Sequence, residues 1–549
     1  MSRQQREARR EFLKKFAALT ACGSAMSMIP QLKLMQSALA QTGPEGDAGY
    51  RALVCVFLGG GNDAFNWLIP RDNTRYAVYQ ASRGTGTGGL AIDQASLLPI
   101  NLTGPGGAAL PGGHQYGLHP ACADWTAVDR NGVQTAMPGL ASLTNQGKVA
   151  WLSNIGSLVV PLTKANFNNP ALPKPPQLYS HNDQTNLWFQ GRETANYRYG
   201  WGGQVADLLF GLNSPIPGSS PVTTLPMNIS FAGSNRFQIG DLVVPYQMSG
   251  CGNPNAGNAA AGTIVGQNFA NCSGSSALSG FRACGTANLN ASEVALCDLL
   301  DNNTSNLMQN EHASVMARSM GLAGSLGTIL GGVAQPPPNP PLYPSVLSTP
   351  FRALADDQAV AGYNLAADGN NSLAEQLAMV ARLIKMRAQL GQTRNIFFVS
   401  LGGFDTHAAQ MPDTGQPRLL RRISRALGSF YRALVEMGVE NSVTTFTMSE
   451  FARTLNSNGD GSDHGWGGIQ LVMGGAVNGG SAASGRLYGT WPDMTLNGAD
   501  SFSRGQMIPT TAMDQMASTL SSWMGLTPTQ INTIFPNVDN FPTANLGFM

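Results

Sequence analysis

Five continuous runs of apolar and β-branched residues, separated by long amphipathic segments, constrain the fold of this chain more than any other feature. The runs span residues 51–60, 148–154, 395–403, 442–448 and 469–475. None of them alternates apolar with polar residues, which is typical of central strands covered on both faces. The pattern predicts an α/β fold with a largely parallel central sheet, helices on both faces and right-handed crossovers.

Two of the intervening segments predict helices with defined ends. Residues 372–391 open with Ser372 and Glu375, which form a capping-box pair, and stop at Gly391. Residues 417–438 begin with a proline, end with a glycine and carry apolar side chains at helical spacing. The order strand, helix, strand supports parallel pairing of the strands that these helices connect.

The composition excludes some classes of function. A chain of 549 residues with 42% hydrophobic residues can bury a large core, either as one big domain or as two. The net charge of +1 argues against a nucleic-acid partner or a membrane surface recognised through bulk electrostatics. After the N-terminal segment no apolar run is long enough for a transmembrane segment.

Residues 1–40 predict an export signal. Arg9 and Arg10 precede a weakly apolar stretch and a small-residue cleavage site, which resembles a twin-arginine signal. We expect the twin-arginine export machinery to carry the folded protein out of the cytoplasm, so that it is periplasmic or secreted after cleavage behind Ala40. A lipoprotein acylated at Cys22 is the alternative, which we favour less because the apolar stretch before it is short.

The rest of the chain divides where its composition changes. Residues 41–249 and 346–549 carry the strand runs and are predicted to be the N-terminal and C-terminal parts of one α/β domain. Residues 250–345 are rich in Cys, Asn, Gly and Pro and are predicted to be an insertion or cap.

The cysteines outside the signal fall into two groups. Cys55 lies inside an apolar run and Cys122 follows "LHPA", so both are predicted to be buried free thiols. The predicted insertion is rich in Asn and Gly and should pack poorly, so cross-links would stabilise it most. Because the protein is predicted to be exported, we expect disulfides there, and their pairing stays open. The candidates are Cys251, Cys272, Cys284 and Cys297.

Polar side chains follow the ends of three predicted strands. Asn62 and Asp63 come after the first run, Asp405 and His407 after the third, and Glu450 after the fourth. The carboxyl ends of parallel strands meet at one edge of a sheet, where sites in such folds gather. We therefore expect these side chains to lie close together.

Imidazoles and carboxylates converging from separate loops are what a divalent ion requires. The chain has only six histidines, and His119, His181, His407 and His464 lie in polar contexts flanked by Gly or Pro. One or two ions of Zn, Mg, Ca or Mn could bind, although any single candidate could instead be a cap or turn residue. The predicted metal ligands are Asp63, Asp405, His407, Glu450, Asp463 and His464.

Several motifs together resemble a known family. They are "FLGGGNDAFNWLIP", "LHP", "LYSHNDQTNLWFQG", "GGFDTH" and "SEFARTLNSNGDGSDHGWGG". Behind a twin-arginine signal, this combination resembles the bacterial family known as domain of unknown function 1501 over nearly the whole mature chain. The resemblance implies a distant relation to alkaline phosphatases, sulfatases and cofactor-independent phosphoglycerate mutases, and hence an alkaline-phosphatase-like fold.

The resemblance also implies roles for individual residues. Asp63 matches the metal-binding Asp after the first strand, and His464 resembles the final metal histidine. The nucleophile position, ten residues before a Gly at a helix start, falls on His181 with Ser180 adjacent. The superfamily uses Ser, Thr or a modified Cys there, so His181 or Ser180 could attack the substrate, or His181 could only bind metal.

Two metal pairs of the superfamily are altered in this sequence. Its Asp-x-x-x-His pair is shortened to Asp405-Thr-His407, and a later Asp-His pair becomes Ser449-Glu450. A standard two-zinc site is therefore not implied by the resemblance.

Two functional hypotheses follow. The first is an exported, metal-dependent hydrolase of phosphate or sulfate esters, acting on a small-molecule or polymer substrate. In it Asn62 donates a hydrogen bond to the substrate, Arg453 either clamps an oxygen or forms a surface salt bridge, and His119 contributes to substrate binding. The second is a non-catalytic binding or assembly protein of the cell envelope that keeps the fold without the chemistry.

Overall fold

The structure of the protein is a computed structural model. It describes residues 49–128, 134–192, 197–216, 224–248, 291–300, 309–310, 313, 322 and 371–549. The predicted export signal and most of the predicted insertion lie outside these ranges, as do Cys22, Cys251, Cys272 and Cys284. The export signal, the domain boundaries and the disulfides therefore stay predictions.

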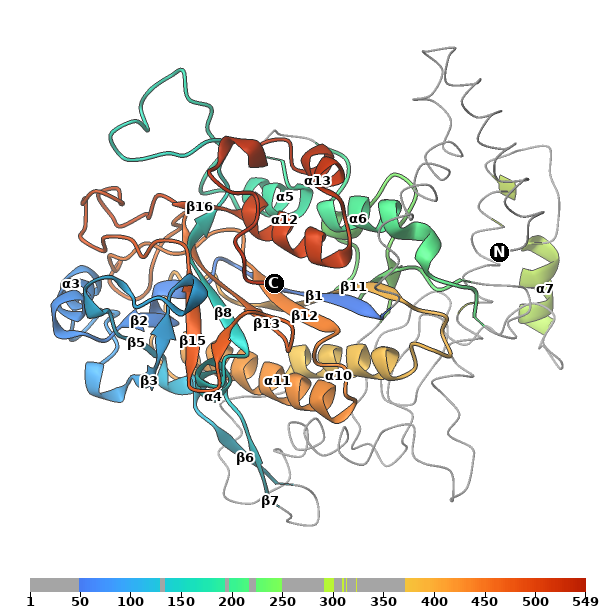
Figure 1. Ribbon diagram of the computed structural model, residues 1–549, viewed down its shortest axis with the longest axis horizontal. Helices are drawn as coiled ribbons and strands as arrows, with labels where there is room; N and C mark the ends of the chain where they lie inside the picture. The colour runs from blue at the N-terminus through green and yellow to red at the C-terminus, as the bar shows by residue number, and fades with distance from the viewer. Residues whose placement is uncertain are drawn as a thin grey trace.

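The described residues form a large central sheet of 11 strands (Figure 1). All five predicted strand runs are confirmed as β1, β8, β11, β12 and β13. Two short strands, β16 (Thr511–Ala512) and β4 (Leu102–Thr103), pair with β8 and β15 off the main path. The order along that path is β10 (Tyr246–Gln247), β9 (Asn228–Ser230), β11 (Arg394–Gly402), β1 (Arg51–Gly59), β12 (Val443–Met448), β13 (Gly468–Met473), β8 (Val149–Gly156), β15 (Ser484–Tyr488), β14 (Gly480–Ser481).

The sheet is mostly parallel, with one central exception. Strands β9, β11, β1 and β12 pair in parallel with one another in that order. Strand β13 runs antiparallel to both β12 and β8. Residues 449–467, which join β12 to β13, form an irregular loop and contain no crossover helix. A connection without such a helix lets the chain return antiparallel.

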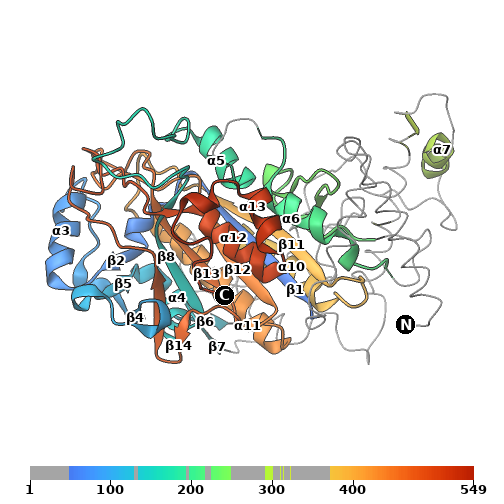
Figure 2. The same cartoon turned by 45° about the horizontal axis from the view of Figure 1, so that its top comes forward.

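Helices cover both faces of the sheet, as predicted (Figures 1 and 2). Alternate side chains of β1 point to opposite faces, so that Val54 and Val56 join one core while Leu53 and Cys55 join the other. The first core packs against α4 (Leu140–Asn145), α10 (Ser372–Lys385) and α11 (Gln416–Glu436). The second packs against α5 (His181–Gln190), α6 (Trp201–Leu209), α12 (Met513–Met524) and α13 (Pro528–Ile534).

Smaller elements form separate units beside the central sheet. A second sheet of three strands, β2 (Leu68–Pro70), β5 (Tyr116–Leu118) and β3 (Leu98–Ile100), lies beside α3 (Asn73–Arg83). Strands β6 (Trp125–Val128) and β7 (Gln134–Met137) pair as a separate ribbon, and α7 (Ala291–Leu300) lies within the predicted insertion. Among the described residues, no helix is both long and apolar enough to cross a membrane.

The two helix predictions need one correction. The capping box at Ser372 is wrong: the N-cap of α10 is Asn371, whose side chain accepts a hydrogen bond from the backbone N–H of Ala374. Helix α10 ends at Lys385 and turns lead on to Gly391, which has a positive φ of 66°. Sequence patterns locate helix ends only to within a few residues, because several polar residues near an end can serve as the cap.

The two cysteines predicted to be buried free thiols are confirmed. Cys55 lies in β1 and Cys122 in a short helix after β5, and both are buried and free. Burial raises the pKa of the Cys55 thiol well above its usual value and that of Cys122 to about 12. Both side chains therefore pack as small apolar groups.

Candidate functional site

A cluster of imidazoles and one carboxylate lies at the carboxyl ends of the central strands. Asp405 and His407 follow β11, His464 lies in the loop between β12 and β13, and His181 is the first residue of α5. One ligand atom from each of His181, Asp405 and His464 can be chosen so that all lie within 4.8 Å of one another. The predicted convergence at the strand ends is found for these residues.

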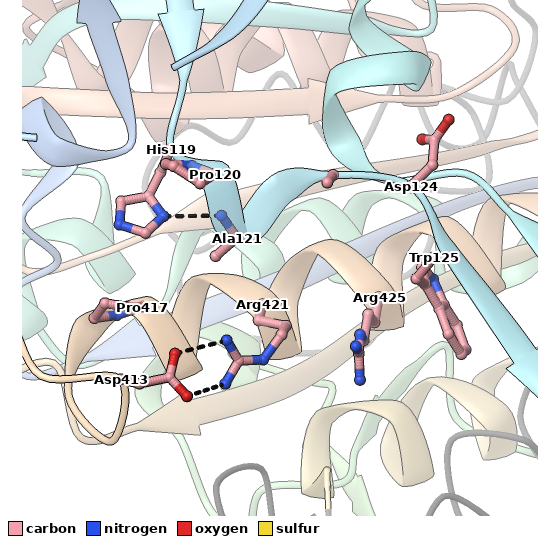
Figure 3. A pocket seen from close by; sticks show the side chains of 10 residues that line it. His119, Pro120, Ala121, Asp124, Trp125, Asp413, Pro417, Arg421 and Arg425 are labelled. Carbon is pink, nitrogen blue, oxygen red and sulfur yellow. Dashed lines mark hydrogen bonds and ion pairs between the residues drawn. The ribbon is translucent and has the colours of Figure 1, made fainter. Parts of the chain in front are cut away.

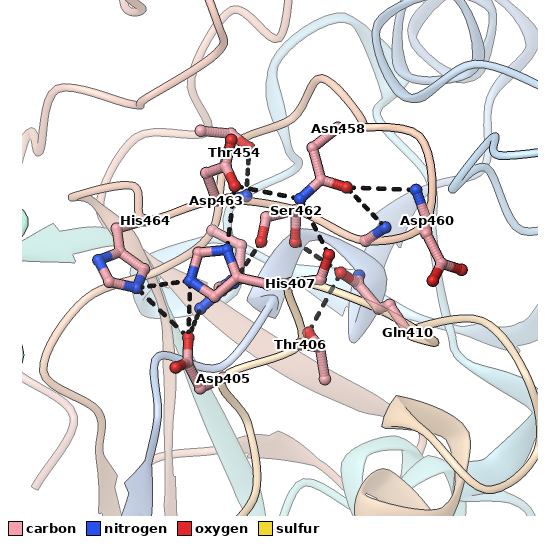
Figure 4. A network of polar contacts seen from close by, with 12 residues as sticks. Asp405, Thr406, His407, Gln410, Thr454, Asn458, Asp460, Ser462, Asp463 and His464 are labelled. Atoms are coloured by element: carbon pink, nitrogen blue, oxygen red, sulfur yellow. Dashed lines mark hydrogen bonds and ion pairs between the residues drawn. The ribbon is translucent and has the colours of Figure 1, made fainter.

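The carboxylate of Asp405 is the centre of the cluster (Figure 4). Its Oδ1 lies 3.1 Å from His407 Nε2 and 3.3 Å from His464 Nε2. Its Oδ2 lies 3.5 Å from His181 Nε2. The Nε2 atoms of His407 and His464 are themselves 3.0 Å apart. We call these four residues the histidine cluster.

The second nitrogen of each ring fixes where the ring hydrogen lies. A carbonyl oxygen only accepts hydrogen bonds, and so does an ionised carboxylate, so the facing Nδ1 atoms must donate. In a neutral ring Nε2 then carries no hydrogen and can bind a cation, whereas in a protonated ring Nε2 donates to Asp405. The Nδ1 partners are Tyr179 O for His464 at 2.8 Å, Glu450 Oε1 for His181 at 2.8 Å and Asp463 Oδ1 for His407 at 3.0 Å.

Electrostatics favour an ionised Asp405 and a neutral His464. Burial raises the pKa of Asp405, but the hydrogen bond and charge of Arg453, with His407 and His181, outweigh it and hold that pKa below its usual value. Burial lowers the pKa of His464, and the positive charge of Arg453 acts in the same direction. Asp405 is therefore a carboxylate and His464 a neutral imidazole at neutral pH.

Arg453 is a buried partner of the cluster. Its guanidinium is fully buried and donates to Asp405 Oδ1 at 2.7 Å and to Gly60 O at 3.1 Å. It also donates to Ser462 O. The predicted contact of Arg453 with a substrate oxygen is not what the structure provides, because these acceptors lie within the protein and no part of the side chain reaches the surface.

Asp63 does not join the cluster. Its carboxylate is fully buried and forms an ion pair with the equally buried guanidinium of Arg83, the last residue of α3. Its Oδ2 also accepts a hydrogen bond from Gln410 Nε2. A charge-neutralising arginine makes Asp63 a structural ion pair here, in place of the predicted metal ligand.

Two other predicted ligands contact the cluster from outside. Glu450 is buried, and its Oε1 accepts from Gly60 N at 2.8 Å besides orienting His181. Asp463 orients His407 and is bound through its Oδ2 by Arg504 at 2.5 Å. Both carboxylates hold imidazoles in place, as outer residues do around metal ligands.

The glycine-rich turn after β1 is required by close packing. Gly60 has a φ of 116°, and a Cβ there would lie 2.3 Å from the backbone nitrogen of Asp405. A Cβ on Gly61 would lie 2.4 Å from the ring of Phe451, which itself packs against His181 and His464 at centroid distances of 4.8 and 4.6 Å. Only glycine lets this turn approach the cluster so closely.

The start of α5 carries the two predicted nucleophile candidates. Ser180 is the N-cap and accepts from Asp183 N at 3.4 Å, while its Oγ donates to Asp183 Oδ2 at 2.5 Å. The helix ends at Gly191 with a φ of 63°. The predicted placement of His181 at a helix start, ten residues before that glycine, agrees with the structure.

Of the two remaining candidates, Asn62 follows the glycine turn beside the cluster, and His119 lies in a separate cavity. Asn62 is buried, and its side-chain amide has no hydrogen-bond partner among the described residues. His119 is buried and accepts from Ala121 N at 3.0 Å through its Nδ1. It lines a cavity of ≈ 290 Å³ together with Asp413 and Arg421 (Figure 3), which shares no lining residue with the cluster. Burial and the nearby charge of Arg421 lower the pKa of His119 to about 4.

Sequence reasoning missed three groups that shape the site. Arg83 neutralises Asp63, the carbonyl of Tyr179 orients His464, and Gln410 joins Asp63 to the loops of the cluster. None of them belongs to a recognisable motif. Their positions depend on how α3 and the loops pack, which the sequence does not reveal.

A family comparison agrees with part of the resemblance seen in the sequence. Residues 352–531 match the model of the family described as Protein of unknown function (DUF1501). This match supports the resemblance to the DUF1501 family over about a third of the chain, and the motifs before residue 352 lie outside it. The matched range includes Asp405, His407 and His464 but not His181. No curated protein and no solved structure gives a significant match to the chain.

Proposed function

We propose that the protein is an exported hydrolase of phosphate or sulfate esters that uses one divalent metal ion held by the histidine cluster. The observation that carries the proposal is the convergence of three Nε2 atoms on the carboxylate of Asp405. Two of these atoms, on His407 and His464, face each other at 3.0 Å. Two nitrogen lone pairs at this distance repel each other unless a proton or a cation lies between them.

The spacing of the ligand atoms fits a single ion. Donor atoms that bind one tetrahedral ion at about 2.0–2.2 Å lie roughly 3.3–3.6 Å from each other. The contacts of Asp405 measure 3.1 and 3.3 Å from Oδ1 to His407 and His464 and 3.5 Å from Oδ2 to His181. Ligand atoms of His181, Asp405 and His464 lie within 4.8 Å of one another, so shifts of about 1 Å would bring them to one ion. Three imidazoles and one carboxylate favour Zn²⁺, or a similar transition metal, over Mg²⁺ and Ca²⁺, which prefer oxygen ligands.

The setting of the cluster favours an anionic ester as substrate. A divalent ion would supply Lewis acidity to an ester oxygen. The ten-residue helix α5 begins at the cluster, and the positive end of its dipole attracts phosphate or sulfate groups.

Ser180 is the better nucleophile candidate of the two at the start of α5. Both ring nitrogens of His181 are engaged, by Glu450 and by the cluster. The hydroxyl of Ser180 instead donates to Asp183, whose carboxylate can receive the proton when the oxygen attacks.

One observation favours the second hypothesis, a non-catalytic binding or assembly protein of the cell envelope. Asp63, which the family resemblance assigns to a metal, is neutralised by Arg83. This ion pair removes one ligand of a two-ion site. A protein that has lost hydrolytic activity would have no need of that ligand. The experiment must therefore separate metal binding from turnover.

The test measures both quantities on protein purified without chelator. Metal content is determined by mass spectrometry, and hydrolysis is followed with aryl phosphate, phosphate diester and aryl sulfate substrates. The variants are His464→Ala and Ser180→Ala. His114→Ala is the matched control, because His114 lies outside the cluster.

The outcomes distinguish the hypotheses. We expect wild type and His114→Ala to hold about one ion per chain and to hydrolyse at least one substrate. His464→Ala should lose both properties, whereas Ser180→Ala should keep the ion and lose turnover. Wild-type protein that holds metal but hydrolyses none of the substrates would support the binding protein, and protein without metal would refute the proposal.

Export is part of the proposal and has its own test. Sequencing the N-terminus of protein taken from the periplasm or medium should give Gln41 as the first residue. Peptide mapping under non-reducing conditions should find pairs among Cys251, Cys272, Cys284 and Cys297. A retained N-terminus or four free thiols would contradict the proposed location.

A further inference from the structure

A buried glutamine, Gln410, connects the ion pair of Asp63 to the loops of the histidine cluster. Figure 4 shows its contacts with Thr406 and Ser462. Gln410 is fully buried, and both polar atoms of its side chain are bonded twice. Its Nε2 donates to Asp63 Oδ2 and, at 3.2 Å, to Gln416 Oε1. Its Oε1 accepts from Ser462 Oγ at 2.6 Å and from Thr406 Oγ1 at 3.2 Å.

The two hydroxyl donors lie on the two loops that carry the cluster. Thr406 lies between Asp405 and His407, and Ser462 lies two residues before His464. The loops also contact each other directly, since Ser462 N donates to Thr406 O at 3.1 Å. One amide oxygen therefore fixes both loops at residues adjacent to, or two positions from, the candidate ligands.

The orientation of the amide is determined by its partners. Two hydroxyl groups can donate to the oxygen, whereas the carboxylate of Asp63 can only accept from the nitrogen. Arg83 donates to the same oxygen, Asp63 Oδ2, whereas Oδ1 has no hydrogen-bond partner among the described residues. The ion pair thus anchors Gln410, and Gln410 anchors both loops.

We propose that Gln410 is a positioning residue, which sets the distance between Asp405 and the imidazoles of His407 and His464. The role rests on the proposed metal site but acts in the metal-free protein as well. Outer residues that orient metal ligands change metal affinity by about 10–100-fold when they are removed. Without Gln410, two buried hydroxyls lose their acceptor and the loops lose a shared support.

The experiment compares Gln410→Met with Gln238→Met. Gln238 is also fully buried and bonded at both ends, donating to Ile229 O at 3.1 Å and Ile396 O at 2.7 Å and accepting from Asn235 Nδ2 at 3.0 Å. It lies by β9, and its partners carry none of the candidate ligands. Both substitutions remove buried hydrogen bonds and keep the side-chain volume.

Two readouts are measured on the full mature protein. Zn²⁺ affinity is determined by competition with a chromophoric chelator, and hydrogen exchange of residues 404–408 and 458–464 is measured on metal-free protein. We expect Gln410→Met to bind Zn²⁺ about 10–100-fold more weakly than wild type and to exchange faster in both segments. Gln238→Met should match wild type in both readouts.

A rescue variant separates positioning from general loss of structure. Combining Gln410→Glu with Asp63→Asn exchanges amide and carboxylate and keeps one negative charge beside Arg83. The double variant should regain Zn²⁺ affinity relative to Gln410→Glu alone, which places two carboxylates together. Equal Zn²⁺ affinity and equal exchange in Gln410→Met and Gln238→Met would overturn the inference. If wild type binds no Zn²⁺ while the exchange difference is found, the metal proposal fails and the positioning role stands.

Discussion

Asp63→Asn tests directly whether this residue is a metal ligand or half of a buried ion pair. The substitution keeps the shape of the side chain and removes its charge, which leaves the guanidinium of Arg83 buried without a counter-ion. Breaking a buried pair by removing one partner costs about 3–5 kcal/mol. Arg83 keeps Asn66 Oδ1 and Thr454 O as acceptors, both at 3.1 Å. We therefore expect Asp63→Asn to lower the free energy of unfolding by about 3 kcal/mol, the lower end of that range.

The assay is urea unfolding of metal-free protein, with Zn²⁺ content measured separately. The control variant is Asp413→Asn, which breaks the ion pair between Asp413 and Arg421. The side chain of Asp413 is 61% exposed. That substitution should cost at most about 1 kcal/mol. Adding Arg83→Gln to Asp63→Asn should restore part of the lost stability, because no unpaired charge then remains. Asp63→Asn protein that loses its metal but keeps the unfolding free energy of wild type would show that Asp63 is a ligand and refute the reasoning.

Three further predictions concern other parts of the molecule. The folded-state pKa of His119, about 4, lies below the value of about 6.5 in an unfolded chain, so stability from the neutral ring is lost as pH falls from 6.5 towards 4. His119→Asn keeps a cap acceptor and should reduce the stability lost between pH 7 and pH 5 by about 2 kcal/mol in urea unfolding, and an unchanged pH dependence would contradict this. Gly60→Ala should lower Zn²⁺ affinity, because its Cβ would displace the Asp405 backbone; wild-type affinity would refute that packing argument. Cys55 and Cys122 should react with a thiol reagent only after unfolding, and rapid labelling of native protein would show that they are not buried.

Much of the fold could be predicted because its central strands are long and apolar. Runs such as 51–60 and 395–403 show no alternation, since cores cover both faces of the sheet. Strands of two or three residues, such as β10 and β16, were missed because so short a segment carries no periodicity. The reversed direction of β13 was also missed, since it depends on the path of the loop that precedes it.

The candidate site could be predicted where it depends on strand ends. Asp405, His407 and His464 follow or precede central strands, and their convergence follows from the sheet. Asp63 occupies the same kind of position but pairs with Arg83, whose approach depends on how α3 packs. Gln410 was missed for a similar reason, because nothing in a single glutamine indicates four buried hydrogen bonds.

The central feature of the proposed site is a cation bound between three imidazoles and one carboxylate. Anomalous diffraction at the zinc edge, from crystals grown with Zn²⁺, tests this directly. We predict one strong peak about 2.0–2.2 Å from the Nε2 atoms of the cluster and from an Asp405 oxygen. A map without a peak at the cluster, or a peak that Asp405 does not touch, would contradict the account.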